Sequence, residues 1–156
     1  MTTYTDAEME LWRELQDFAD KASGDWKTHV ASYLVWPDGR KVFGANHLRD
    51  GHGLTKQEIT ERVRPKYYDA MKCSEADAID KATELGLDLR DAKLYSLLFP
   101  CPRCAEQIAK TDIKYIVSRK HRVGHNGKFV SNALQDTQQI FDKANIHYDA
   151  GEPDAR

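Results

Sequence analysis

Three cysteines and one glutamate carry the residue types and the spacing needed for metal chemistry. Cys73 and Glu75 lie two residues apart, and Cys101 and Cys104 lie three apart, each pair at the start of a predicted helix. Residues three apart share one face of a helix, so Cys101 and Cys104 can bind the same ion. With Cys73 they make three ligands and leave one tetrahedral position open, which is the arrangement of catalytic zinc. We therefore predict a bound Zn²⁺ as cofactor.

Glu75 is the fourth chemical group of this pattern, and it is not needed as a ligand. Its position two residues after Cys73 suits it to moving protons to and from a water molecule at the metal. Each of the two helix N-termini carries about half a positive charge, which favours the thiolate form of the cysteines. The sequence thus predicts Glu75 as the catalytic acid and base.

Three other interpretations of the cysteines compete with a catalytic zinc. A structural zinc site would need a fourth protein ligand, for which the candidates are His29, His47 and His52. A redox pair formed by the last two cysteines would leave the first cysteine and the glutamate unexplained. Cysteines can also serve as small buried hydrophobic residues. We favour the catalytic site because it alone gives Glu75 a task.

Charge and cysteine content exclude several classes of protein. The formal net charge of −2 gives no overall field that attracts nucleic acid, so we expect a small-molecule partner instead. An odd number of cysteines, 3, argues against a disulfide framework and for metal ligands in a reducing compartment. No apolar stretch approaches the roughly 20 residues that span a membrane, and Met1–Ala7 is too polar for a signal peptide. We therefore expect a cytoplasmic protein without a membrane partner.

The elements that position these residues follow from the periodicity of the apolar residues. The length fits one domain over 1–156, with a polar tail over 149–156, a long irregular stretch over 45–72 and a basic loop over 119–128. Strands alternate with helices, which predicts an α/β fold with helices on both faces of a sheet. The predicted helices span 6–23, 55–63, 74–85, 102–110 and 131–144, and the predicted strands span 29–36, 41–44, 93–99, 114–118 and 146–148.

The sequence resembles the cytidine and deoxycytidylate deaminase family, and within it the deoxycytidylate branch. The matching stretches are Val42–Asn46, Arg64-Pro65 with Tyr68, Cys73–Ile79 and Leu94–Ala105. A Cys-x-Glu segment followed by Pro-Cys-x-x-Cys is the three-cysteine variant of the zinc deaminase pattern. The likeness extends over residues 6–148, although its specific motifs occupy a small part of that range.

The resemblance implies a fold, a reaction and a set of site residues. The fold is a three-layer αβα arrangement with a mixed sheet of about five strands, and the protein is expected to be a homo-oligomer. The reaction is the conversion of dCMP to dUMP with release of ammonia, so the small-molecule partner is a nucleotide or nucleoside. The three cysteines are implied as metal ligands and Glu75 as the proton shuttle. The implied substrate-binding residues are Asn46, Arg64, Tyr68 and Ser74.

Three departures from the deoxycytidylate branch leave the substrate open. That branch usually has histidine at the position of Cys73, alanine at that of Ser74 and asparagine at that of Asp77. The alternatives are a deaminase of a nucleoside or another base (cytidine, guanine or adenine) and a non-catalytic zinc protein. A nucleotide would need local cations for its phosphate, for which the candidates are Arg49, Arg62, Arg64, Lys66, Arg119, Lys120, His121, Arg122 and Lys128.

Overall fold

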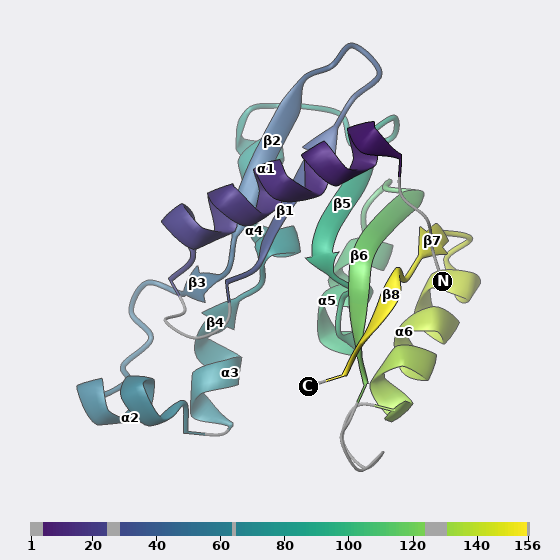
Figure 1. Ribbon diagram of the computed structural model, residues 1–156. Helices are drawn as coiled ribbons and strands as arrows, with labels where there is room; N and C mark the ends of the chain where they lie inside the picture. The colour runs from purple at the N-terminus through teal and green to yellow at the C-terminus, as the bar shows by residue number, and fades with distance from the viewer. Residues whose placement is uncertain (1–4, 25–28, 64, 124–130, 156) are drawn as a thin grey trace.

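The computed structural model describes residues 5–24, 29–63, 65–123 and 131–155, which form three layers (Figure 1). A central sheet separates one helix from three others. This confirms the predicted α/β architecture with helices on both faces.

The main sheet mixes antiparallel and parallel pairing. Five of its six strands are β1 (Ala31–Val35), β2 (Lys41–Ala45), β5 (Lys93–Leu98), β6 (Tyr115–Val123) and β7 (His147–Asp149), in the spatial order β2-β1-β5-β6-β7. The sixth, β8 (Glu152–Ala155), pairs with β6. β1 pairs antiparallel with β2 and with β5, whereas β6 pairs parallel with β5 and with β7. Four of these strands were predicted at nearly these bounds, because each has a clear apolar core bounded by turn residues. The fifth, β6, was predicted over 114–118 and continues to Val123.

Helix α1 (Asp6–Ala22) covers one face of the sheet. It begins with a capping box in which the Thr5 hydroxyl accepts from the Glu8 backbone N–H and the Glu8 carboxylate accepts from the Thr5 N–H. Three side chains of its apolar face are buried against β1 and β5, namely Trp12, Leu15 and Ala19. The helix therefore closes this side of the sheet, away from the predicted metal ligands.

Three helices cover the opposite face: α4 (Ser74–Glu84), α5 (Pro102–Ala109) and α6 (Ser131–Lys143). They bury the larger of the two apolar clusters against the sheet, with Leu34, Leu94, Ile108, Ile116 and Phe141 among its members. Within the described ranges, no helix has the length and apolar character needed to cross a membrane.

The connection between β2 and α4 has more structure than its irregular sequence predicts. Besides the expected short helix, found as α2 (Lys56–Glu61), it contains α3 (Lys66–Ala70) and two strands, β3 (His47–Leu48) and β4 (Met71–Lys72). The two strands pair antiparallel and bring the end of β2 next to the start of α4. Elements of two to five residues are too short to produce a recognisable hydrophobic period, which is why the sequence did not reveal them.

The C-terminal edge of the sheet corrects two predictions. The basic loop was expected from Arg119, but β6 continues to Val123. Residues 149–156 were expected to be a polar tail, but Glu152–Ala155 form a strand. This strand, β8, pairs parallel with the second half of β6 while β7 pairs with the first half. Gly151 separates β7 from β8 with φ +71°, and a Cβ there would lie 2.2 Å from the Arg119 carbonyl oxygen. Polar edge strands lack the apolar alternation that sequence analysis detects.

Candidate metal centre

Two helix N-termini present the cysteines. Cys73 is the N-cap residue of α4 and Cys101 is the N-cap residue of α5, both with extended backbone, and neither thiol caps its own helix. Pro102 occupies the first turn of α5, where its missing N–H costs no hydrogen bond. Cys104 lies in the same turn. The sequence therefore delivers all three thiols to the beginnings of two helices that contact each other.

Two of the three thiols lie close to the glutamate. The Sγ atoms of Cys73 and Cys104 and a carboxylate oxygen of Glu75 all lie within 4.8 Å of one another. Cys101 lies outside this group, but its thiol is hydrogen-bonded to that of Cys104, which also contacts Cys73. Cys104 is buried, Cys73 is half-buried and Cys101 is exposed, so the cluster reaches from the interior to the surface.

Hydrogen bonds among the thiols give Cys101 and Cys104 different pKa values. The Cys104 thiol donates a hydrogen bond to Cys101 and lowers the pKa of Cys101 to about 6. The Cys104 backbone N–H and the charge of Arg103 lower this pKa further, whereas burial and the nearby Glu75 raise it. The pKa of Cys104 is raised because its proton is held between Cys101 and Cys73 and because the thiol is buried. Cys101, the exposed cysteine, therefore loses its proton most readily. A thiol must lose its proton before it can bind a metal ion.

Glu75 is a carboxylate placed in a nearly closed environment. It is 4% exposed, and burial raises its pKa above the ordinary value for glutamate. The strongest opposing interaction is a hydrogen bond from the Ser96 hydroxyl, whose Oγ lies 2.7 Å from Glu75 Oε1. A buried carboxyl with a raised pKa holds a proton more readily than an exposed one, which suits it to both accepting and giving a proton.

Ser32 and Ser96 take part in this site, although the sequence analysis does not select their hydroxyls as functional. Ser96 contacts Glu75, and the Ser32 hydroxyl donates to Ser96 over 2.9 Å. The signal in the sequence that could have identified them is that Ser32 and Ser96 are each a polar residue within an otherwise mostly apolar strand. A serine in a buried strand needs a hydrogen-bond partner, and here the partners come from other elements.

The donor set fits zinc. Thiolates with a nearby carboxylate match the ligands that zinc prefers, whereas Mg²⁺ and Ca²⁺ prefer oxygen. Within the described ranges, the only group of three or more potential metal ligands is the one that holds Cys73, Glu75 and Cys104. The three histidines considered as a fourth ligand have other contacts. His29 contacts Asp20, His47 contacts the Ala45 carbonyl, and His52 accepts from the Leu54 N–H. This arrangement favours an open coordination position over a closed structural site.

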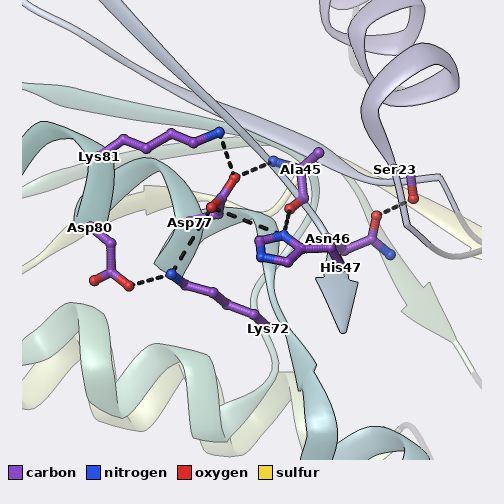
Figure 2. Close-up of polar contacts among 8 residues, drawn as sticks. All are labelled: Ser23, Ala45, Asn46, His47, Lys72, Asp77, Asp80 and Lys81. Carbon is purple, nitrogen blue, oxygen red and sulfur yellow. Dashed lines mark hydrogen bonds and ion pairs between the residues drawn. The ribbon is translucent and has the colours of Figure 1, made fainter. Parts of the chain in front are cut away.

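Asp77 fastens the helix that carries Cys73 and Glu75 to strand β2 (Figure 2). Its Oδ2 accepts from the Ala45 backbone N–H over 3.0 Å and lies 3.0 Å from Lys81 Nζ. Its other oxygen lies 4.0 Å from both His47 Nδ1 and Lys72 Nζ. The Asp77 side chain is only 8% exposed. A buried charge is costly unless it is paired, and these neighbouring groups compensate it.

Of the residues predicted to bind substrate, Asn46 and Ser74 have described side chains. Asn46 is buried, and its Oδ1 accepts from the Ser23 hydroxyl (Figure 2). The same oxygen also accepts from the Val30 N–H. Asn46 therefore holds the chain before β1 against the end of β2. Ser74 is also buried, with its Oγ 2.6 Å from Ser32 Oγ. Arg64 and the side chain of Tyr68 lie outside the described part of the chain.

The described candidate cations for a phosphate lie on two segments of the chain, the connection between β2 and α4 and the strand β6. Lys66 pairs with Glu58 at 3.1 Å, and the Arg62 guanidinium lies over the Tyr67 ring at 5.4 Å. The second set belongs to β6 from Arg119 to Arg122, not to a loop, and Lys128 is outside the described residues. Arg103, considered as a partner for a thiolate, donates to Asp69 on α3 at 3.0 Å.

The fold and this site define a class of protein. An αβα sandwich in which two neighbouring helix starts bring cysteines and a buried glutamate together is the design of zinc-dependent hydrolytic deaminases. The sequence profile of the "Cytidine and deoxycytidylate deaminase zinc-binding region" matches residues 6–120. The chain therefore belongs to the cytidine and deoxycytidylate deaminase family, and it is a zinc-binding deaminase.

Solved structures share the fold over nearly the whole chain. The dCMP deaminase of the cyanophage S-TIM5 in apo form matches with a TM-score of 0.65 at 15% identity, covering 97% of this chain and 100% of that chain. The same enzyme in complex with dCMP and dUMP matches with a TM-score of 0.62 at 15% identity, covering 99% of this chain and 100% of that chain.

A bifunctional protein of Thermotoga maritima is similar in fold as well. This diaminohydroxyphosphoribosylaminopyrimidine deaminase/5-amino-6-(5-phosphoribosylamino)uracil reductase matches with a TM-score of 0.62 at 18% identity, covering 92% of this chain but 35% of that chain. No curated protein sequence matches the chain. At these identities the structural likeness establishes the fold, and it confirms the predicted cytidine-deaminase-like architecture.

Proposed function

We propose that this protein deaminates a cytosine nucleotide by hydrolysis and converts dCMP to dUMP with release of ammonia. The observation that carries the proposal is the buried Glu75 carboxylate within 4.8 Å of the thiols of Cys73 and Cys104. Support for a nucleotide substrate comes from the fold, which agrees over its full length with an enzyme solved in complex with dCMP and dUMP.

In this proposal the thiolates of Cys73, Cys101 and Cys104 would hold zinc. Zinc, when bound there, acts as a Lewis acid that activates water for attack on C4 of the cytosine ring. The N-termini of α4 and α5 offset the negative charge of three thiolates, because each helix directs unpaired N–H groups toward its first turn.

Glu75 moves the protons of the reaction. It takes one proton from the attacking water and delivers it to N3 of the ring. It then takes the proton of the new C4 hydroxyl and gives it to the amino group, so that the C4–N bond breaks, ammonia leaves and uracil forms. Burial serves this task in two ways, because it raises the pKa of Glu75 above the ordinary value for glutamate and excludes bulk water from the proton path. The hydrogen bond from Ser96 keeps one carboxylate oxygen in place.

The substrate contacts and the assembly follow from the family resemblance. Asn46, Arg64, Tyr68 and Ser74 contact the nucleotide. The hydroxyl of Ser74 is engaged with Ser32, so its backbone is the part that is available for the base. We further propose that the protein is a homo-oligomer, as the family resemblance implies. We propose a cytoplasmic location, because the free thiols suit a reducing compartment.

The test is ammonia release from the zinc-loaded protein. The substrates to compare are dCMP, CMP, deoxycytidine, cytidine, cytosine, guanine and adenosine. Turnover of dCMP well above that of deoxycytidine would support both the deaminase and its phosphate recognition. Activity on deoxycytidine equal to that on dCMP would replace the nucleotide with the nucleoside. Silence across the panel from folded protein with one zinc per chain would contradict the proposal.

A further inference from the structure

A chain of buried hydroxyl groups leads to the catalytic carboxylate. Ser74 Oγ lies 2.6 Å from Ser32 Oγ, Ser32 Oγ lies 2.9 Å from Ser96 Oγ, and Ser96 Oγ lies 2.7 Å from Glu75 Oε1. The three serines come from α4, β1 and β5, and none is more than 1% exposed. The chain therefore links two strands and a helix without access to solvent.

The hydrogen bonds of this chain have one direction. Each serine hydroxyl has a single proton to donate. Ser32 donates its proton to Ser96, so the bond between Ser74 and Ser32 must be donated by Ser74. Every donor in the chain then points toward Glu75. Hydrogen bonds aligned in this way polarise one another, so the last one, which ends on a charged group, is the strongest.

Ser96 has two acceptors within reach of its one proton. Its Oγ lies 2.7 Å from Glu75 Oε1 and 2.8 Å from the carbonyl oxygen of Leu98. Both acceptors lie within reach of the same buried hydroxyl, one on the first turn of α4 and one at the end of β5. The Ser96 side chain therefore links the carboxylate of Glu75 to the strand that carries Ser96.

We propose that Ser96, backed by Ser32 and Ser74, is a positioning residue for Glu75. Its hydroxyl lies 2.7 Å from Oε1 and fixes the orientation of the carboxylate from the buried side. This inference rests on the proposed function, in which Glu75 is the catalytic carboxylate. Ser96 contacts no reacting atom itself and acts only through the glutamate.

The neighbouring strand provides a matched control. Ser118 on β6 pairs in register with Ser96 and is equally buried, at 1% exposed. Among the described residues its hydroxyl has no hydrogen-bond partner. Ser118→Ala therefore removes the same atom at the same depth of the same sheet without changing the chain of hydroxyls. Any effect common to both variants comes from the loss of a buried oxygen alone.

The experiment compares Ser96→Ala, Ser32→Ala and Ser118→Ala in the full-length, zinc-loaded protein. With dCMP as substrate, we expect Ser96→Ala to lower kcat about 10- to 100-fold. KM should stay within about twofold and zinc at one per chain, because the hydroxyl touches neither substrate nor metal. Ser32→Ala should lower kcat by a smaller factor, and Ser118→Ala should leave it unchanged. Crystal structures of the variants should show the Glu75 carboxylate displaced or in more than one orientation only where the chain is broken.

The outcomes separate this inference from the proposed function. Equal kcat values for Ser96→Ala and Ser118→Ala, or a Glu75 carboxylate that keeps its place without Ser96, overturn the positioning role even if the enzyme deaminates dCMP. If the wild type deaminates nothing in the panel, a carboxylate displaced by Ser96→Ala but not by Ser118→Ala supports the positioning role while the proposed function fails. If Ser96→Ala does not fold, Ser32→Ala decides by the same comparison.

Discussion

Gly44 on β2 lies so close to Ser74 on α4 that a side chain at this position would overlap the helix. A Cβ on Gly44 would lie 2.4 Å from the Ser74 carbonyl oxygen and 2.4 Å from the Ala78 nitrogen. Both are backbone atoms of the helix, so neither can rotate away. The absence of a side chain at Gly44 therefore sets the distance between the sheet and the first turn of α4, which carries Glu75.

Gly44→Ala should destabilise the fold and disturb the site together. Overpacking of this kind costs about 1–3 kcal/mol in the free energy of unfolding, and relief of the overlap must shift α4. We expect a lower urea midpoint and a loss of kcat in the same variant. Gly39→Ala is the control, because Gly39 has φ +89° but open space around it. Gly39→Ala should lower stability through backbone strain and leave kcat unchanged. A Gly44→Ala enzyme with wild-type kcat would contradict the role of Gly44 in placing α4.

Glu75→Gln should separate metal binding from turnover. The amide keeps the size of the side chain and can still accept from Ser96, but it cannot take up a proton from water. We expect one zinc per chain, an unchanged melting temperature and a kcat lowered by about 10²–10⁴-fold. Glu84→Gln on the exposed end of the same helix is the control and should keep full activity. Near-wild-type turnover by Glu75→Gln would remove Glu75 from the mechanism.

The sequence revealed the elements that have a strong hydrophobic period. Trp12, Leu15 and Ala19 repeat at helical spacing and are the residues that α1 buries, so its predicted bounds of 6–23 nearly equal Asp6–Ala22. The thiols were predictable for a related reason. Helix geometry brings Cys101 and Cys104 together from their spacing alone, and the N-terminal position of both pairs follows from local turn chemistry.

What the sequence did not reveal depends on contacts between distant segments. Ser96 reaches Glu75 only because β5 lies beneath the first turn of α4, and Ser32 joins them only in one register of β1 against β5. Sheet register is set by the whole fold, so no local pattern announces such a contact. β8 was missed for the same kind of reason, because its polar residues pair with β6 only after Gly151 has redirected the chain.

Asp77→Ala should show how much the anchor between β2 and α4 contributes to stability. The variant leaves the Ala45 N–H without its acceptor and Lys81 without its partner. Loss of one member of such a buried set costs about 2–4 kcal/mol. Asp77→Asn keeps an acceptor for the Ala45 N–H and should lose less. Chemical denaturation of the zinc-loaded protein measures both.

Asp80→Ala is the matched control for Asp77. Asp80 also pairs with Lys72, but its side chain is 55% exposed, so its loss should cost less than about 1 kcal/mol. Equal destabilisation by Asp77→Ala and Asp80→Ala would show that the buried contacts of Asp77 add nothing beyond an ordinary surface pair.

The metal-free protein should have one unusually reactive cysteine. Hydrogen bonding from Cys104 lowers the pKa of Cys101 to about 6, and Cys101 is the exposed member of the cluster. Because its folded-state pKa is depressed, the thiolate predominates above about pH 6 and is lost as pH falls through that value. Cys104 should react last, since it is buried and its pKa is raised. Iodoacetamide labelling between pH 5 and 9, read by peptide mass spectrometry, measures the order and the midpoint.

Zinc is the control for this labelling experiment. A metal that uses Cys101 as a ligand should protect it, so the zinc-loaded protein should lose the fast phase and removal of zinc by a chelator should restore it. Because the chain has only 3 cysteines, each modified peptide is assigned without ambiguity. Fast labelling of Cys101 that persists with one zinc per chain would exclude it as a ligand. A rate that rises only above about pH 8, as for an ordinary thiol, would contradict the hydrogen-bonded cluster itself.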